Sequence, residues 1–210
     1  MGYFYALLAA FLFGANGSVS KVIIEAGFSA IQLTQMRVLG AAVISGIVLL
    51  ALDRRSFRLP PRQWPVIIIL GVVGVGLLQA TYAFAIALLP VGIALLLEYL
   101  AVLMVAVVAF FFFKEKVHIR LWAAIALVIV GLIVVAEIWA STLNPVGVLW
   151  GLAAAISLAT YFLVGERQLK TISPLALSFW TMSVASLFWA PFSRWWTFTS
   201  ETFTTVTSLG

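Results

Sequence analysis

The sequence predicts an all-α fold, a polytopic bundle of about seven transmembrane helices, on three observations. Of the 210 residues, 64% are hydrophobic and only 9% are charged, and the mean hydropathy is +1.19. Soluble domains average about 45–50% apolar and about 25% charged residues, so these few charges cannot cover a water-soluble surface. Apolar runs of membrane-crossing length recur along the chain, and the charges fall in short clusters between them.

The first three predicted spans are Tyr3–Val22, Ile31–Leu52 and Pro65–Leu88. Each has the roughly 20 mainly apolar residues that a helix needs to cross a hydrocarbon core of about 30 Å. No Lys or Arg precedes the first span, so it lacks the positive segment of a signal peptide and is expected to be a retained helix. Asp53 to Trp64 carries four arginines and the pair Pro60-Pro61, which predicts an exposed loop.

Two local patterns stand out within these spans. Small and polar residues between Gly14 and Ser20 make the outer half of the first span weakly helical, which is typical of a broken transporter helix or of a fraying helix end. In the third span, small residues at helical spacing favour close helix packing over a hinge, and these are Gly71, Gly74, Gly76 and Ala80.

The remaining four predicted spans are Val91–Phe113, Leu121–Ile138, Val146–Val164 and Pro174–Phe192. The run Phe110–Phe113 is expected to face lipid or the membrane interface. His118 lies between basic residues and is expected to be a solvated loop residue, since the chain has no second His and no Cys to complete a metal site. Residues 193–210 show no helical periodicity and are predicted to form a polar tail.

The basic residues predict the orientation, because positively charged loops are retained in the cytoplasm. With the N-terminus inside, only Lys21 and Arg194 lie on the outer side. Nine lie on the inner side: Arg54, Arg55, Arg58, Arg62, Lys114, Lys116, Arg120, Arg167 and Lys170. We therefore expect a multi-pass plasma-membrane protein with a cytoplasmic N-terminus and an external tail.

Polar side chains inside the spans are the best indicators of function, because each is costly unless it faces a cavity or a partner. Those of the first four spans share one layer in the outer half of the bundle, and they are Asn16, Arg37, Gln79, Tyr82, Glu98 and Tyr99. One interpretation is a binding pocket in which Glu98 exchanges a proton or binds solute. The other is a structural ion pair between Arg37 and Glu98 that ties two helices together.

Several function classes are excluded by what the chain lacks. It has no cysteine, one histidine and one aspartate, Asp53, which lies in a basic loop, so no protease, lipid-modifying or metal site can be assembled. It has no phosphate-binding loop, which excludes ATP-driven transport by this chain alone. No enzyme activity, cofactor, metal or nucleic-acid partner is expected.

The chain resembles the drug/metabolite transporter superfamily, EamA type. The likeness lies in the order and spacing of motifs over residues 2–139 and, more loosely, 147–192: Gly14, Asn16 and Lys21, then Arg37, then Ala94 to Leu100, then Glu115, Leu127 and Gly131. The family usually has a proline where this chain has Ala101-Val102, and a glycine where it has Ala124.

The resemblance implies two five-helix repeats, the second inverted because each holds an odd number of helices. Residues 2–139 would form the first repeat and residues 146–192 part of the second. A pocket between them would place Tyr161 and Trp180 opposite the six polar residues named above. Tyr and Trp would stack on the solute, Asn16 and Gln79 would orient it, and Glu98 would bind an amine or exchange a proton.

The first hypothesis is therefore a secondary permease that moves a small metabolite, in the outward direction. A full second repeat would need about three more helices. The second hypothesis is a truncated or vestigial membrane protein, inactive alone or completed by another chain as a homo- or hetero-dimer. A channel is less favoured, because no ring of repeated charged residues appears.

Overall fold

The computed structural model describes residues 2–114, 119–136 and 143–193. Over these residues the chain is helical, with no strand, and forms seven rods, as predicted. Six are single helices: α1 (Gly2–Glu25), α2 (Ala30–Leu52), α5 (Val91–Phe111), α6 (Ile119–Ala136), α7 (Pro145–Gln168) and α8 (Pro174–Trp189). The described parts of α2, α5, α7 and the composite third rod are long and apolar enough to cross a membrane.

The third rod is composite, which the sequence did not predict. It begins with the 3-10 turn η2 (Pro61–Gln63), continues through α3 (Trp64–Ile69) and the π-helical segment η3 (Leu70–Leu77), and ends with α4 (Leu78–Leu88). A second 3-10 turn, η1 (Arg54–Phe57), precedes it in the predicted loop. The arginines of that loop are exposed, as expected.

Side-chain caps explain where three of the helices begin. Ser29 and Gln32 form a reciprocal capping box at the start of α2, which satisfies backbone N–H groups that a helix start leaves unpaired. Asn144 and Ser173 accept backbone hydrogen bonds at the starts of α7 and α8. Both caps are followed directly by proline, whose fixed φ angle suits the first helical position.

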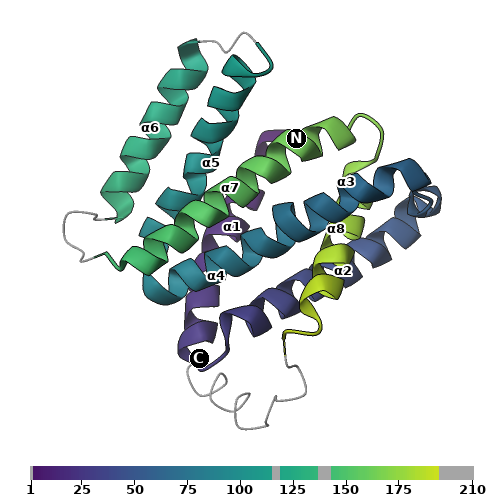
Figure 1. The fold of residues 1–210 in the computed structure, drawn as a ribbon, viewed down its shortest axis with the longest axis horizontal. Helices are drawn as coiled ribbons and strands as arrows, with labels where there is room; N and C mark the ends of the chain where they lie inside the picture. Colours follow the sequence, from purple (N-terminus) through teal and green to yellow (C-terminus); the bar gives the residue numbers. More distant parts are fainter. Residues whose placement is uncertain (1, 115–118, 137–142, 194–210) are drawn as a thin grey trace.

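The helices alternate in direction, and segments far apart in sequence lie side by side (Figure 1). α7 packs along α5, α4 and η3, whereas α8 packs against α2 and η3. α6 packs chiefly against α5, at one side of the bundle. α1 touches α2, α4 and α5 along a smaller surface.

The glycines of η3 let two helices approach closely, so close packing is the correct interpretation of the small-residue pattern. A Cβ atom built on Gly71 would lie 2.6 Å from the Val184 side chain of α8, and one on Gly74 would lie 3.2 Å from Tyr161 of α7. On Gly76 it would lie 3.3 Å from Trp189 Nε1 of α8. We call the contact of these three glycines with α7 and α8 the glycine interface.

The expectation for the first span was wrong, because α1 is one continuous helix from Gly2 to Glu25, neither broken nor frayed around Gly14 to Ser20. In a helix all backbone groups pair within the segment, so small residues are tolerated at membrane depth. The Ser20 hydroxyl donates to the carbonyl of Asn16 at 2.6 Å, which satisfies that side chain locally as well.

Two other expectations can be compared with the structure. All four residues of Phe110–Phe113 are exposed on the protein surface, consistent with a lipid-facing run. His118, Glu115 and the tail after Ser193, with Arg194, lie outside the described residues.

Candidate functional site

Three ionisable side chains from three helices lie near one another inside the bundle. Arg37 of α2, Tyr82 of α4 and Glu98 of α5 lie close enough to interact electrostatically with one another. Glu98 is 3% exposed and Tyr82 is 5% exposed. We call these three residues the polar cluster; all three belong to the layer of six polar residues that the sequence predicted.

Three buried polar atoms of the polar cluster lack hydrogen-bond partners. Arg37 Nη1, Tyr82 Oη and Glu98 Oε2 are all buried, and none has a hydrogen-bond partner within the described parts of the chain. More than nine-tenths of buried polar groups in folded proteins find a partner, so each exception needs an explanation. Of the seven buried side-chain atoms without a partner among the described residues, three belong to this one cluster.

Arg37 and Glu98 do not form a contact ion pair. Across residues 2–114, 119–136 and 143–193, the salt bridge that the structure contains is between Lys21 and Glu25. The interpretation of Arg37 and Glu98 as a static helix-tying pair therefore lacks the contact that it requires.

α1 forms one wall of the polar cluster through a glycine. A Cβ atom on Gly17 would lie 2.7 Å from Tyr82 Oη and 2.9 Å from the Val91 side chain. The backbone of α1 thus lies close to the tyrosine hydroxyl, and a larger residue at Gly17 would displace the Tyr82 or Val91 side chain. Asn16, the neighbouring residue, is half-buried on the same helix.

The other first-half residues lie at the edge of the cluster. Tyr99 interacts electrostatically with both Tyr82 and Glu98, and it is half-buried. Gln79 lies on α4, close to one turn before Tyr82, and is also half-buried. The predicted layer of Gln79, Tyr82, Glu98 and Tyr99 is thus drawn from α4 and α5, which form the expected hairpin around Leu89 and Pro90.

The two second-half residues pack elsewhere. Tyr161 and Trp180 flank an apolar core cluster around Leu49, Ile67 and Leu70, towards the end of the bundle that carries the arginine loop. The Trp180 ring contacts that of Trp64 with centroids 4.9 Å apart, and its buried Nε1 has no partner among described residues. Tyr82 belongs to a different core cluster.

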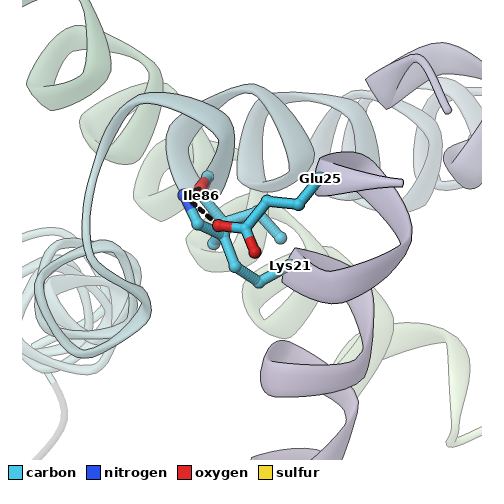
Figure 2. A network of polar contacts seen from close by, with 3 residues as sticks. All are labelled: Lys21, Glu25 and Ile86. Atoms are coloured by element: carbon cyan, nitrogen blue, oxygen red, sulfur yellow. Dashed lines mark hydrogen bonds and ion pairs between the residues drawn. The ribbon is translucent and has the colours of Figure 1, made fainter. Parts of the chain in front are cut away.

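Sequence reasoning missed three polar contacts that connect helices. Gln35 of α2 donates to the Ser186 hydroxyl of α8 at 3.1 Å, and Trp189 Nε1 donates to the carbonyl of Gly76 at 2.9 Å. Lys21 of α1 donates to the carbonyl of Ile86 at 2.6 Å (Figure 2). Only the last had a sequence signal, since Pro90 lies four residues after Ile86 and cannot supply the backbone donor.

No group of three metal-ligating side chains comes together in the part of the chain that the structure describes. An open cleft of about 520 Å³ lies at the end of the bundle where α1 meets α2 and α8 ends. Ser29, Gln32 and Ser193 are its polar lining residues, and it is separate from the polar cluster.

Comparison with known proteins gives one finding. The family model described as the EamA-like transporter family matches residues 1–136 and 145–209. No curated protein and no solved structure gives a significant match to the chain.

Proposed function

Because the chain belongs to the EamA-like transporter family, we propose that it is a secondary permease that moves a small metabolite across the plasma membrane, in the outward direction. The single observation that carries the proposal is the unsatisfied polar cluster of Arg37, Tyr82 and Glu98. A buried polar group without a partner costs about 1–3 kcal/mol. A solute that passes through the cluster would supply the missing partners.

Each side chain has a chemical role in this proposal. Glu98 binds an amine or exchanges a proton, and Arg37 binds an anionic group. Tyr82 and Tyr99 offer aromatic faces on which a solute stacks, and Asn16 and Gln79 orient it. Tyr161 and Trp180 line the same path nearer the arginine-loop end, where the buried Trp180 Nε1 is an unused donor.

Counterflow in proteoliposomes tests the proposal. Vesicles loaded with one unlabelled solute and diluted into its labelled form should accumulate the label when that solute is a substrate, with amino acids, sugars and nucleotide precursors as the panel. Glu98→Gln should reduce the initial rate about tenfold or more, because a neutral amide neither holds a cation nor exchanges a proton. Glu166→Gln is the matched control, since Glu166 is exposed near the end of α7.

Failure of every solute in the panel to move would contradict autonomous transport. Movement that requires a second chain in the same vesicle would assign the activity to a complex instead. Equal rates for wild type and Glu98→Gln, with transport intact, would remove the polar cluster from the path.

The proposed orientation has a separate test. The arginine loop and the α7–α8 turn lie at one end of the bundle, where Gln63 donates to Thr171 at 3.3 Å. The α1–α2 turn and the end of α8 lie together at the other end, around the open cleft. Because the chain has no cysteine, a membrane-impermeant maleimide added to whole cells should label Pro191→Cys and leave Arg58→Cys unlabelled. The reverse pattern would place the N-terminus outside.

A further inference from the structure

The last turn of α4 ends with an unpaired carbonyl that another helix satisfies. In an α-helix the carbonyl of Ile86 would accept from the backbone N–H four residues later, but that residue is Pro90, which has none. The Lys21 ammonium of α1 donates to this carbonyl at 2.6 Å. Figure 2 shows the Lys21 side chain extending from α1 to the backbone of α4 at Ile86.

The hydrogen bond from Lys21 to Ile86 lies one helical turn away from the contact between Gly17 and Tyr82, on the same faces of α1 and α4. Lys21 and Gly17 are four residues apart and share one face of α1, and Ile86 and Tyr82 are four residues apart on α4. Lys21 meets Ile86 across 65 residues of sequence, and Gly17 meets Tyr82 across the same separation. The two helices therefore run parallel here, with two stacked contacts one turn apart.

Lys21 binds the Ile86 carbonyl of α4 more closely than it binds Glu25 on its own helix. Glu25 lies 3.9 Å from the Lys21 ammonium, and its side chain is 64% exposed. Such an exposed pair contributes little to stability. A cation at the C-terminal end of a helix, by contrast, also complements the negative end of the helix dipole.

We propose that Lys21 is a positioning residue for transport. Its bond to the Ile86 carbonyl holds α1 in register on α4, so that the backbone at Gly17 stays against Tyr82 Oη and the tyrosine ring keeps its place beside Glu98. This inference rests on the proposed function of the polar cluster. α1 has only a small contact surface with α4 and α5. The single hydrogen bond from Lys21 therefore contributes strongly to the position of α1.

The first experiment compares two substitutions in the counterflow assay. Lys21→Met keeps the length of the side chain but removes the donor, whereas Lys21→Arg keeps a charged donor. We expect Lys21→Met to raise the KM about fivefold or more while the maximal rate per folded protein stays close to wild type. Lys21→Arg should restore most of the affinity.

Two controls separate positioning from charge. Glu25→Gln removes the weak pair and Lys170→Met removes an exposed cation at the other end of the bundle, and neither should change the KM. An unchanged KM in Lys21→Met would overturn the proposal. So would a KM in Glu25→Gln that rises as much as in Lys21→Met.

The second experiment does not depend on transport. Spin labels on Val22→Cys and Ala87→Cys report the distance between α1 and α4, and the absence of native cysteine makes the labelling specific. Adding Lys21→Met should broaden the distance distribution, and adding Lys21→Arg should not. An unbroadened distribution contradicts the role of Lys21 even if transport is found, whereas a broadened one without any transport by wild type contradicts the proposed function alone.

Discussion

The composite rod contributes Tyr82 to the polar cluster and three glycines to the glycine interface, and the two regions differ in whether their buried polar atoms have partners. Around Tyr82, in α4, three buried polar atoms have no partner in the described structure. Around Gly76, in η3, the backbone carbonyl accepts from the Trp189 indole at 2.9 Å. In the glycine interface the helices are so close that a Cβ atom would overlap α8 at Gly71 and would be tightly packed at Gly74 and Gly76.

Under the proposed function, the difference separates a region that stabilises the fold from one that binds the solute. Dense packing and satisfied hydrogen bonds lower the free energy of the folded state. Unpaired buried groups raise it, and a fold retains them where another molecule completes them. Substitutions in the two regions should therefore have opposite signatures: the glycine interface should respond in stability and the polar cluster in transport.

The largest expected loss of stability comes from adding one methyl group to the glycine interface. In Gly71→Ala the new Cβ atom would lie 2.6 Å from the Val184 side chain and 2.9 Å from the carbonyl of Thr181. The backbone oxygen cannot move without shifting α8. We expect the free energy of unfolding to fall by about 2–3 kcal/mol, measured by reversible denaturation in mixed detergent micelles.

Gly131→Ala on α6 is the matched control, because nothing lies within 4 Å of a Cβ atom at that position. It should leave stability unchanged or raise it by less than about 1 kcal/mol. Combining Gly71→Ala with Val184→Ala should recover part of the loss. Equal effects of Gly71→Ala and Gly131→Ala would show that the glycine interface is not tightly packed.

A smaller loss is expected from the indole that binds the π-helical segment. Trp189→Phe removes the donor to the Gly76 carbonyl and leaves a smaller ring among Phe188 and Phe192. We expect a loss of about 1–2 kcal/mol in the free energy of unfolding. The KM for the transported solute should not change. A raised KM with unchanged stability would place Trp189 in the transport path and weaken the contrast between the two regions.

The third prediction concerns the buried hydrogen bond between α2 and α8. Ser186→Ala leaves the Gln35 amide without the hydroxyl to which it donates at 3.1 Å. An unsatisfied buried donor should cost about 1 kcal/mol. Gln35→Met should cost less than Ser186→Ala, because it removes the whole amide, including the buried Oε1 atom that has no partner among the described residues, and the Ser186 hydroxyl that remains can rotate towards a carbonyl of its own helix. If Gln35→Met cost more, the side chain would contribute by shape rather than by its hydrogen bond.

The sequence predicted the helical rods and a polar layer that includes Arg37, Tyr82 and Glu98, since the apolar length of a span and a residue's position along it can be read from the sequence itself. It did not predict the π-helical segment, because the glycines around Gly74 fit an α-helix equally well and the choice depends on helices far away in sequence. The contacts of Gln35 with Ser186 and of Trp189 with Gly76 were missed for the same reason. They join residues separated by 151 and 113 positions, and no local pattern marks them.

The smallest expected effect on stability is at the polar cluster, and it is the sharpest test of the contrast. Tyr82→Phe removes a buried hydroxyl that has no partner in the described structure. Removing an unsatisfied group loses no hydrogen bond and eliminates a desolvation cost, so the free energy of unfolding should change by less than about 0.5 kcal/mol or rise. The KM of the same variant should rise about fivefold or more, because the solute loses a partner. A clear loss of stability with an unchanged KM would mean that the Tyr82 hydroxyl has a hydrogen-bond partner within the fold. The polar cluster would then stabilise the fold, as the glycine interface does.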